Sequence, residues 1–398
     1  MKVSEVTKKD MKSYNHLFEK LISYENLSLA IDRSSLGKRN RYEVKRILEN
    51  KDKYIKQLQD LLINKKLKIR KHEAIQINDG MRAKKRLIIK PDYIYEQILH
   101  HALVQVLTPV FMHGMYQFSC GSLPNRGGLY GKRYLAKYIK ENPKKIKYVA
   151  KGDITKFFQT VNIELVKEKF KKKIHDERML EIIFLVLDSN IATYKGEDIN
   201  MGLPIGYYTS QWVANWFLQE FDYFIKQKLK IKCYVRYVDD FVLLSSNKKE
   251  LHNAFKAIQE YLTGLDLKLK PNYQVFKFAY IDKRGRQRGR PIDFMGYKFY
   301  RDRTVLRKGI LLRAARKAKR ISKKVNLNWY ECTQMLCYLG WFKYTDTYKF
   351  FERYIKPKVN IGQCKKIVST RQRRINKRLQ NDYVKLEESR KLKQTGSN

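Results

Sequence analysis

The stretch CYVRYVDDFVLLSS, residues 233–246, places two adjacent carboxylates, Asp239 and Asp240, between two runs of strand-forming side chains. Such runs around a short polar centre predict a tight β-hairpin with the acids at its turn. Neighbouring carboxylates raise each other's pKa unless a cation neutralises them. Oxygen ligands of this kind suit Mg²⁺, which proteins hold through one or two carboxylates together with substrate phosphates. An ordinary turn is the alternative, because Asp also favours turns for its own backbone hydrogen bonds.

The composition favours a folded protein that binds a polyanion. The 398 residues are 43% hydrophobic and 13% aromatic, enough for two or three domains with a sizeable core. The formal net charge of +46 attracts polyanions through counterion release, so nucleic acid is the favoured partner and a membrane surface the weaker one. We find neither a long apolar run nor a signal-peptide pattern, and expect a soluble protein that is not exported.

The cysteines carry no metal or disulfide signature. There are five, scattered along the chain, and no two of them form a Cys-x-x-Cys pair: Cys120, Cys233, Cys332, Cys337 and Cys364. Neither a zinc site nor a disulfide framework is indicated, which favours a reducing, cytoplasmic setting.

Apolar spacing and turn residues divide the chain into helices and strands. Helices are predicted over 13–67, 93–110 (ended with the help of Pro109), 164–187, a segment capped by Thr209 or Ser210 and running to about Ile225, 248–262, and several basic segments after Val305. Strands are predicted over 69–77, 85–89, 148–153, the two arms of the 233–246 hairpin, 265–269 and 294–300. The glycine-containing passage Ser119–Gly128 is interpreted as a loop lining a substrate channel.

A third carboxylate, Asp153, ends the predicted strand Tyr148–Asp153. If this strand neighbours the acidic hairpin, Asp153, Asp239 and Asp240 form one cluster. Such a cluster fits phosphoryl transfer by two Mg²⁺ ions, which clamp the attacking and leaving oxygens. The basic cluster Lys84, Lys85 and Arg86 could hold a triphosphate through charge-assisted hydrogen bonds.

Five motifs in order resemble the fingers-to-palm series of reverse transcriptases. They are Arg86-Leu-Ile-Ile, Asp153-Ile-Thr-Lys-Phe-Phe158, Leu203-Pro-Ile-Gly-Tyr-Tyr-Thr-Ser-Gln211, Tyr237-Val-Asp-Asp240 and Phe294-Met-Gly-Tyr297. They span roughly residues 60–300, and although one tetrapeptide is a weak signal, the ordered set is specific.

The resemblance implies an α+β, right-hand polymerase fold with fingers, a palm built on an antiparallel sheet, and a helical thumb. The domain boundaries we predict are 1–67 for a helical lead-in, 68–150 for fingers, 151–300 for the palm with finger segments, 301–360 for the thumb and 361–398 for a basic tail. The thumb helices would grip a duplex through its shape and phosphates.

The resemblance also implies residue roles. Asp153, Asp239 and Asp240 would be catalytic, and with Ile154 they would bind two Mg²⁺ ions, with Mn²⁺ as a substitute. Phe158 stands where these enzymes place the steric gate against a ribose 2′-hydroxyl; the alternative is that Phe157 and Phe158 are both core residues. The remaining implied residues are Lys84, Lys85, Arg86, Ile205, Gly206 and Gln211 for nucleotide binding, and Phe294, Met295, Gly296 and Tyr297 for a primer grip.

The segment Leu203–Gln211 departs from the retroviral pattern at two positions. Ile205 replaces a glutamine near the incoming nucleotide, and Gln211 replaces a proline. Gly206, Ser210 and Gln211 resemble instead the reverse transcriptases of diversity-generating retroelements, which misincorporate opposite template adenines. Loss of a polar group that checks the nascent pair would lower discrimination. The alternative is that Ile205 serves packing alone.

The resemblance implies template RNA, an RNA/cDNA duplex and dNTPs as partners, together with a small oligomeric helical accessory protein, and no membrane. A defence-associated bacterial reverse transcriptase is the first alternative. A non-catalytic RNA-binding protein on a polymerase scaffold is the second. We expect no RNase H domain and no zinc-type endonuclease.

Overall fold

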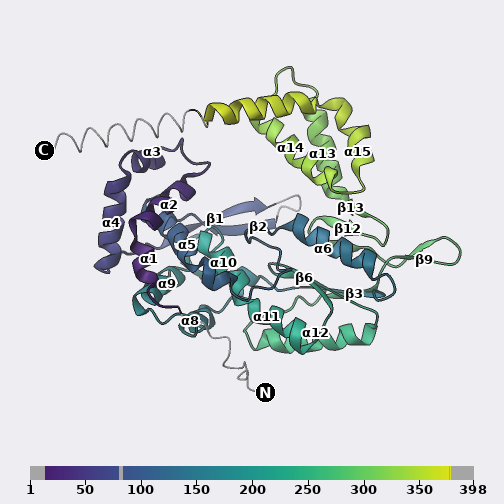
Figure 1. The fold of residues 1–398 in the computed structure, drawn as a ribbon, viewed down its shortest axis with the longest axis horizontal. Coiled ribbons are helices and arrows are strands. Elements are labelled where there is room, and N and C mark those ends of the chain that lie inside the picture. The colour runs from purple at the N-terminus through teal and green to yellow at the C-terminus, as the bar shows by residue number, and fades with distance from the viewer. Residues whose placement is uncertain (1–13, 80–83, 376, 378–398) are drawn as a thin grey trace. The chain divides into compact units, whose positions relative to one another are not determined.

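The computed structural model describes residues 14–79, 84–375 and 377, and for Asp79 and Lys84 the backbone alone. The chain divides into two compact units, whose elements are labelled in Figure 1. Unit 1 comprises the described parts of residues 1–131 and 150–275, and unit 2 comprises residues 132–149 and the described residues after 275. The chain passes between the units at three places, which lie within one helix and two strands.

Unit 1 begins with helices, as the spacing of apolar residues predicts. They are α1 (Leu17–Ile22), α2 (Tyr24–Ser35), α3 (Tyr42–Glu49) and α4 (Lys51–Ile63), shown in purple and blue in Figure 1. The periodic side chains Ile47, Ile55, Leu58 and Leu62 are buried. Helix α4 contacts α1, α2 and α3, and α1 and α2 in turn contact α5 (Ile98–Met112).

The helix predicted over 93–110 differs from expectation at both ends. Its first turn, η2 (Tyr93–Gln97), is irregular, because Ile94 is extended and Tyr95 has a φ of 69°. Pro109 does not end the helix and lies inside α5. The helix continues to Met112 before an extended His113 ends it.

A four-stranded sheet in the order β2-β1-β4-β5 follows these helices. The predicted strands β1 (His72–Asp79) and β2 (Lys84–Ile89) pair antiparallel, with Ala74 opposite Ile89. Two short strands that sequence reasoning missed, β4 (Ile191–Tyr194) and β5 (Glu197–Asn200), complete it, β4 running parallel to β1. A cluster of buried side chains stabilises this sheet: Ala74, Ile89, Ala192, Met201 and Tyr207.

The second sheet of unit 1 carries the acidic hairpin, and its strand order is β6-β7-β3-β8. The hairpin is formed by β6 (Cys233–Tyr237) and β7 (Asp240–Ser245), beside β3 (Tyr148–Asp153) and β8 (Gln274–Lys277). The helix α12 (Lys248–Thr263) packs against β7, and the hairpin predicted over 233–246 is confirmed. The strand predicted over 265–269 is wrong, because its one strand-like contact is an isolated bridge from Leu269 to Ile154.

The remaining helices of unit 1 surround the two sheets. They are α7 (Phe157–Thr160), α8 (Ile163–Lys171), α9 (Glu177–Asp188), α10 (Tyr208–Phe217), α11 (Gln219–Tyr223) and η3 (Phe224–Lys228), while α6 (Gly128–Glu141) leads into unit 2. The single helix predicted over 164–187 is therefore two helices. Asp176 separates them, because its carboxylate caps α9 and accepts bonds from the backbone of Leu17 and Phe18 at 2.7 and 2.8 Å.

The predicted cap of α10 is also wrong. The N-cap position is Tyr207, which makes no side-chain cap bond. The Thr209 hydroxyl instead lies 3.0 Å from Nδ1 of the buried His100, so a tertiary contact takes the place of the cap.

Unit 2 has three short strand pairings followed by the basic helices. Its strands are β9 (Tyr280–Ile281), β10 (Gln287–Arg288), β11 (Ile292–Phe294), β12 (Tyr297–Phe299) and β13 (Thr304–Leu306). Its helices are α13 (Lys308–Ile321), α14 (Trp329–Lys343), α15 (Tyr348–Tyr354), the 3₁₀ turn η4 (Lys356–Lys358) and a last helix over 361–375. Predicted helices after Val305 are thus confirmed. No helix of the described residues is both long and apolar enough to cross a bilayer.

Candidate active site

The turn of the acidic hairpin is two residues long. Tyr237 pairs with Asp240, so Val238 and Asp239 are the two residues of the turn. Asp239 and Asp240 are half-buried, whereas Val238 is 7% exposed. The acids therefore lie at the turn, as the sequence predicts.

The structure brings Asp153 to this turn. Strand β3 lies beside β7, and the amide of Ile154 donates a hydrogen bond to the backbone oxygen of Asp239 at 3.3 Å. Burial raises the pKa of Asp240 to about 6, and the neighbouring charges of Asp153 and Asp239 and a hydrogen bond to the Asp153 side chain add to the rise. The three carboxylates thus form one electrostatically coupled cluster.

Two lysines that sequence reasoning did not assign lie at this cluster. The Lys270 ammonium is 2.5 Å from Oδ1 of Asp153. The backbone amide of Lys270 also donates a hydrogen bond to the Asp153 backbone oxygen at 2.9 Å. The positive charge of Lys151 lowers the pKa of Asp240, whereas the neighbouring carboxylates raise it. Their sequence context held no signal, since both are lysines in a chain rich in lysine.

The carboxylate oxygens of this cluster are candidate ligands for a divalent cation. As the side chains stand, no three His, Cys, Asp or Glu residues in the described ranges are grouped so that they could hold a metal ion. One oxygen of Asp153 lies against the Lys270 ammonium. The chemistry nonetheless fits, because two hydrogen-bonded carboxylates, one with a raised pKa, are hard oxygen donors that a cation would ionise.

A buried ion pair supports the hairpin from behind. Arg236 and Asp222 are 0% and 1% exposed, and two bonds of 2.7 and 2.5 Å join them. Arg236 also donates to the backbone oxygen of Val238 at 2.9 Å and to Asn215, while the Tyr234 hydroxyl donates to Asp222. Burial alone would lower the Arg236 pKa, but Asp222 reverses this and holds the pKa above its usual range. A charge inside the apolar run CYVRYV was the sequence signal for this network.

Apart from Phe158, the residues predicted to bind nucleotide lie on β2, on the loop that holds Ile205 and Gly206, and on α10. Lys85 is exposed and Arg86 is half-buried on β2, while the side chain of Lys84 lies outside the described residues. Strand β2 is tied to the Leu203–Gln211 segment, because the Ile89 amide donates to the Ile205 backbone oxygen at 2.9 Å. Gln211, the last residue of that segment, is half-buried on α10.

The candidate gate, Phe158, follows the same strand as Asp153. Phe157 is 1% exposed and is a core residue, whereas Phe158 is half-buried with its ring 5.7 Å from that of Phe157. The Phe158 backbone oxygen accepts a bond from the Leu203 amide at 2.7 Å. A Cβ on Gly202 would lie 2.3 Å from the same oxygen, so this position requires glycine. Backbone bonds thus connect the Asp153 strand with the Leu203–Gln211 segment.

The predicted primer-grip residues belong to unit 2. Phe294 and Tyr297 pair across the turn between β11 and β12, and both are buried. Met295 and Gly296 form the turn with φ values of 51° and 88°. A Cβ on Gly296 would be 3.0 Å from the Trp341 ring, which also lies against Tyr297.

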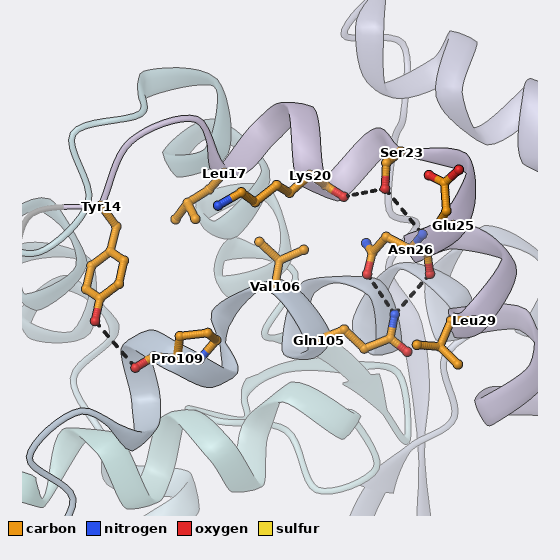
Figure 2. Close-up of a pocket in the computed structure, with 10 residues that line it drawn as sticks. All are labelled: Tyr14, Leu17, Lys20, Ser23, Glu25, Asn26, Leu29, Gln105, Val106 and Pro109. Carbon is orange, nitrogen blue, oxygen red and sulfur yellow. Dashed lines mark hydrogen bonds between the residues drawn. The ribbon is translucent and has the colours of Figure 1, made fainter.

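A separate pocket of about 460 Å³ lies among α1, α2 and α5 (Figure 2). Asn26 and Gln105, which line the pocket, are hydrogen-bonded to each other. The Gln105 side-chain amide donates to the backbone oxygen of Asn26 at 3.0 Å and to its Oδ1 at 2.8 Å. Leu17, Leu29 and Val106 form its apolar wall. None of the predicted site residues lines it, so this pocket is distinct from the aspartate cluster.

Asp153 ends β3 and is hydrogen-bonded to Asp240, at the turn between β6 and β7. Carboxylates grouped in this way suit metal-assisted phosphoryl transfer. The profile of the family described as reverse transcriptase (RNA-dependent DNA polymerase) matches residues 69–299, more than half of the chain. The chain therefore belongs to the reverse transcriptase family. The α+β fold class of a right-hand polymerase, predicted from the five motifs, is confirmed.

Two further comparisons are distant. The chain is 20% identical over 247 residues to Protein YkfC of Escherichia coli K12, a match that covers 52% of this chain and 62% of that protein. The chain thus spans less than two thirds of the curated relative. It also resembles the structure of telomerase from Candida albicans in complex with a fragment of telomeric RNA, with 12% identity, 73% of this chain and 55% of that chain covered, and a TM-score of 0.41.

Proposed function

We propose that this chain is an RNA-directed DNA polymerase that copies a template RNA into cDNA, with Asp153, Asp239 and Asp240 as its catalytic residues. The observation that carries the proposal is the meeting of Asp153 with the Asp239–Asp240 turn inside a chain of the reverse transcriptase family. A protein that merely binds RNA has no need for three coupled carboxylates, whose mutual repulsion destabilises the fold.

The same aspartates would hold two Mg²⁺ ions, or Mn²⁺ in their place, with Ile154 contributing its backbone oxygen. Bound ions supply positive charge that lowers the pKa of a primer 3′-hydroxyl and stabilises the pyrophosphate leaving group. Lys85 and Arg86 bind the triphosphate of the incoming dNTP from β2, together with Lys84. Phe158 excludes a ribose 2′-hydroxyl, and residues Phe294–Tyr297 position the primer end.

The charge of the chain supports RNA as the template. The arginines and lysines of the 282–290 turn and of α13 are mostly exposed, and cationic surfaces of this density bind phosphate backbones. The five cysteines are all free, in keeping with a reducing, cytoplasmic setting.

We further assign the chain to the diversity-generating type, error-prone at template adenines and working with a small oligomeric helical accessory protein. Gly206, Ser210 and Gln211 support this assignment through their resemblance to that group. Ile205 is half-buried and places an apolar side chain where a glutamine amide would check the nascent base pair.

The test is Mg²⁺-dependent dNTP incorporation on an RNA template with an annealed DNA primer. Asp239→Asn and Asp240→Asn keep side-chain volume and remove charge, and each should lower incorporation by at least about 100-fold. Asp60→Asn is the control, because Asp60 is an exposed carboxylate on α4. Incorporation by Asp239→Asn equal to that of the control would refute the catalytic assignment and leave an RNA-binding protein.

A further inference from the structure

The residue before the catalytic carboxylates adopts a conformation that its side chain disfavours. Val238 has a φ of 58°, in the left-handed region that β-branched residues rarely enter. It is the first residue of a two-residue hairpin turn, a position at which glycine is usual when φ is positive. Such strain persists only where surrounding contacts fix it, and it occurs most often at functional sites.

One contact that fixes this turn is the Arg236 guanidinium. It donates to the Val238 backbone oxygen at 2.9 Å, so rotation of the peptide between Val238 and Asp239 would break a charge-assisted bond. The guanidinium itself is immobile, because Asp222 accepts two of its bonds and Asn215 accepts another two, one on its side chain and one on its backbone oxygen. All of these groups are buried.

The second contact comes from the glycine-containing segment after Phe118. The Cys120 amide donates to the Arg236 backbone oxygen at 2.8 Å, and the Arg236 amide donates to that of Phe118 at 3.1 Å, so this segment lies along the edge of β6. A Cβ on Gly121 would be 2.4 Å from Cγ2 of Val238 and 2.9 Å from its nitrogen. The segment therefore packs directly on the turn, and only glycine fits at position 121.

We propose that Arg236 is a positioning residue for the nucleotidyl-transfer reaction. Together with Gly121 it holds Val238 in the left-handed conformation, and this conformation sets where Asp239 and Asp240 stand relative to Asp153. The inference rests on the proposed function, because it assigns a role in placing the proposed catalytic groups. Neither Arg236 nor Gly121 touches substrate in this account, and their effect passes through Val238.

The first experiment combines Arg236→Lys with Val238→Gly. Lysine keeps the charge that pairs with Asp222, but its single ammonium does not reproduce the guanidinium fork that reaches the Val238 oxygen as well. We expect kcat to fall at least 10-fold, KM for dNTP to change less than twofold, and the Mg²⁺ concentration for half-maximal activity to rise. Glycine adopts a positive φ without strain, so adding Val238→Gly should restore kcat at least threefold. A role in stability alone predicts that the Mg²⁺ concentration for half-maximal activity of the folded enzyme stays at its wild-type value.

The second experiment changes Gly121, which packs on the turn, and leaves the ion pair between Arg236 and Asp222 intact. Gly121→Ala should lower kcat at least 10-fold, and Val238→Ala, which removes the clashing Cγ2 atom, should restore part of the loss. Gly127→Ala is the matched control in the same segment, because its Cβ would meet no atom within 4 Å. Equal activity of Gly121→Ala and Gly127→Ala would overturn the proposal, as would failure of both rescues.

Failure of the proposed polymerase activity can be distinguished from failure of the role proposed for Arg236. A wild-type protein that incorporates no dNTP refutes the proposed function. The coupling between Arg236 and Val238 is then still measurable by urea unfolding of the two single variants and the double variant. Additive effects of the two substitutions on the free energy of unfolding would refute the proposal that Arg236 fixes the conformation of Val238, and non-additive effects would support it.

Discussion

Replacing Gly206 by alanine tests how the nucleotide-binding segment is joined to β2. Gly206 has a φ of 118°, and a Cβ at this position would lie 1.9 Å from the backbone oxygen of Ile89. The obstacle is backbone in a buried part of the sheet, and no side chain can move aside to relieve it. The adjacent bond from the Ile89 amide to the Ile205 oxygen must therefore lengthen or break.

The magnitude follows from comparison with a second glycine. Gly196 also has a positive φ, 87°, but a Cβ there would meet no atom within 4 Å. Gly196→Ala therefore measures backbone strain alone, about 1–2 kcal/mol, partly offset by the lower entropy of the unfolded chain. Gly206→Ala adds overpacking of about 1–3 kcal/mol and a weakened backbone hydrogen bond of about 1 kcal/mol. We expect a total destabilisation of about 3–6 kcal/mol before the unfolded-chain entropy is subtracted.

The assay is urea unfolding of both variants, followed by KM for dNTP wherever the protein stays folded. Gly206→Ala should lose at least about 2 kcal/mol more than Gly196→Ala. Its KM should rise while that of Gly196→Ala stays near wild type, because Ile205 and Gly206 belong to the nucleotide-binding segment. Equal unfolding free energies for the two variants would show that the close approach of Gly206 to Ile89 is not part of the folded protein in solution.

Three other predictions concern single residues of the site. Phe158→Ala should admit NTPs, because the ring that crowds a 2′-hydroxyl is gone, and an unchanged ratio of dNTP to NTP incorporation would contradict the gate. Ile205→Gln should reduce misincorporation opposite template adenine, as read by sequencing the cDNA; an error spectrum without adenine bias in both proteins would argue against the assigned subtype. Lys270→Met removes the ammonium beside Asp153 and should tighten Mn²⁺ binding without nucleotide by about twofold to fivefold, the scale of a partly exposed ion pair. Weaker binding would mean that Lys270 supports the metal site and does not compete with it.

The acidic hairpin was predictable because its signal is local. Strand-forming side chains flank two carboxylates in one short stretch, and β3 ends at Asp153 as its pattern indicates. The sequence could predict that Asp153 lies near Asp239 only on the condition that their strands are neighbours. The structure meets this condition, because β3 lies beside β7.

Elements that depend on tertiary contacts were not predictable. The strands β4 and β5 have only four residues each, and β4 is held in the sheet by its pairing with β1 and β5. Residues 265–269 alternate like a strand but have no strand to pair with along their length. The break at Asp176 reflects bonds to Leu17 and Phe18, more than 150 residues away.

The support of the turn was visible in the sequence only as an anomaly. Arg236 is a charge within an apolar strand, which indicates a buried partner but does not say which residue it is. Asp222 lies 14 positions earlier, on the short helix α11, and nothing in the local sequence joins the two residues, so the pairing required the structure. Glycine at position 121 likewise acquires a reason only when Val238 is seen beside it.

The most direct test asks whether Asp153, Asp239 and Asp240 surround a common divalent cation. Fe²⁺ replaces Mg²⁺ at oxygen sites and, with ascorbate and peroxide, cleaves the backbone next to where it binds. We expect cleavage near residue 153 and near residues 239–240 together. Excess Mg²⁺ should suppress this cleavage, and the Asp239→Asn variant should not show it. Cleavage at only one of these two places, or cleavage that Asp239→Asn leaves unchanged, would contradict the claim that the three carboxylates form one catalytic site.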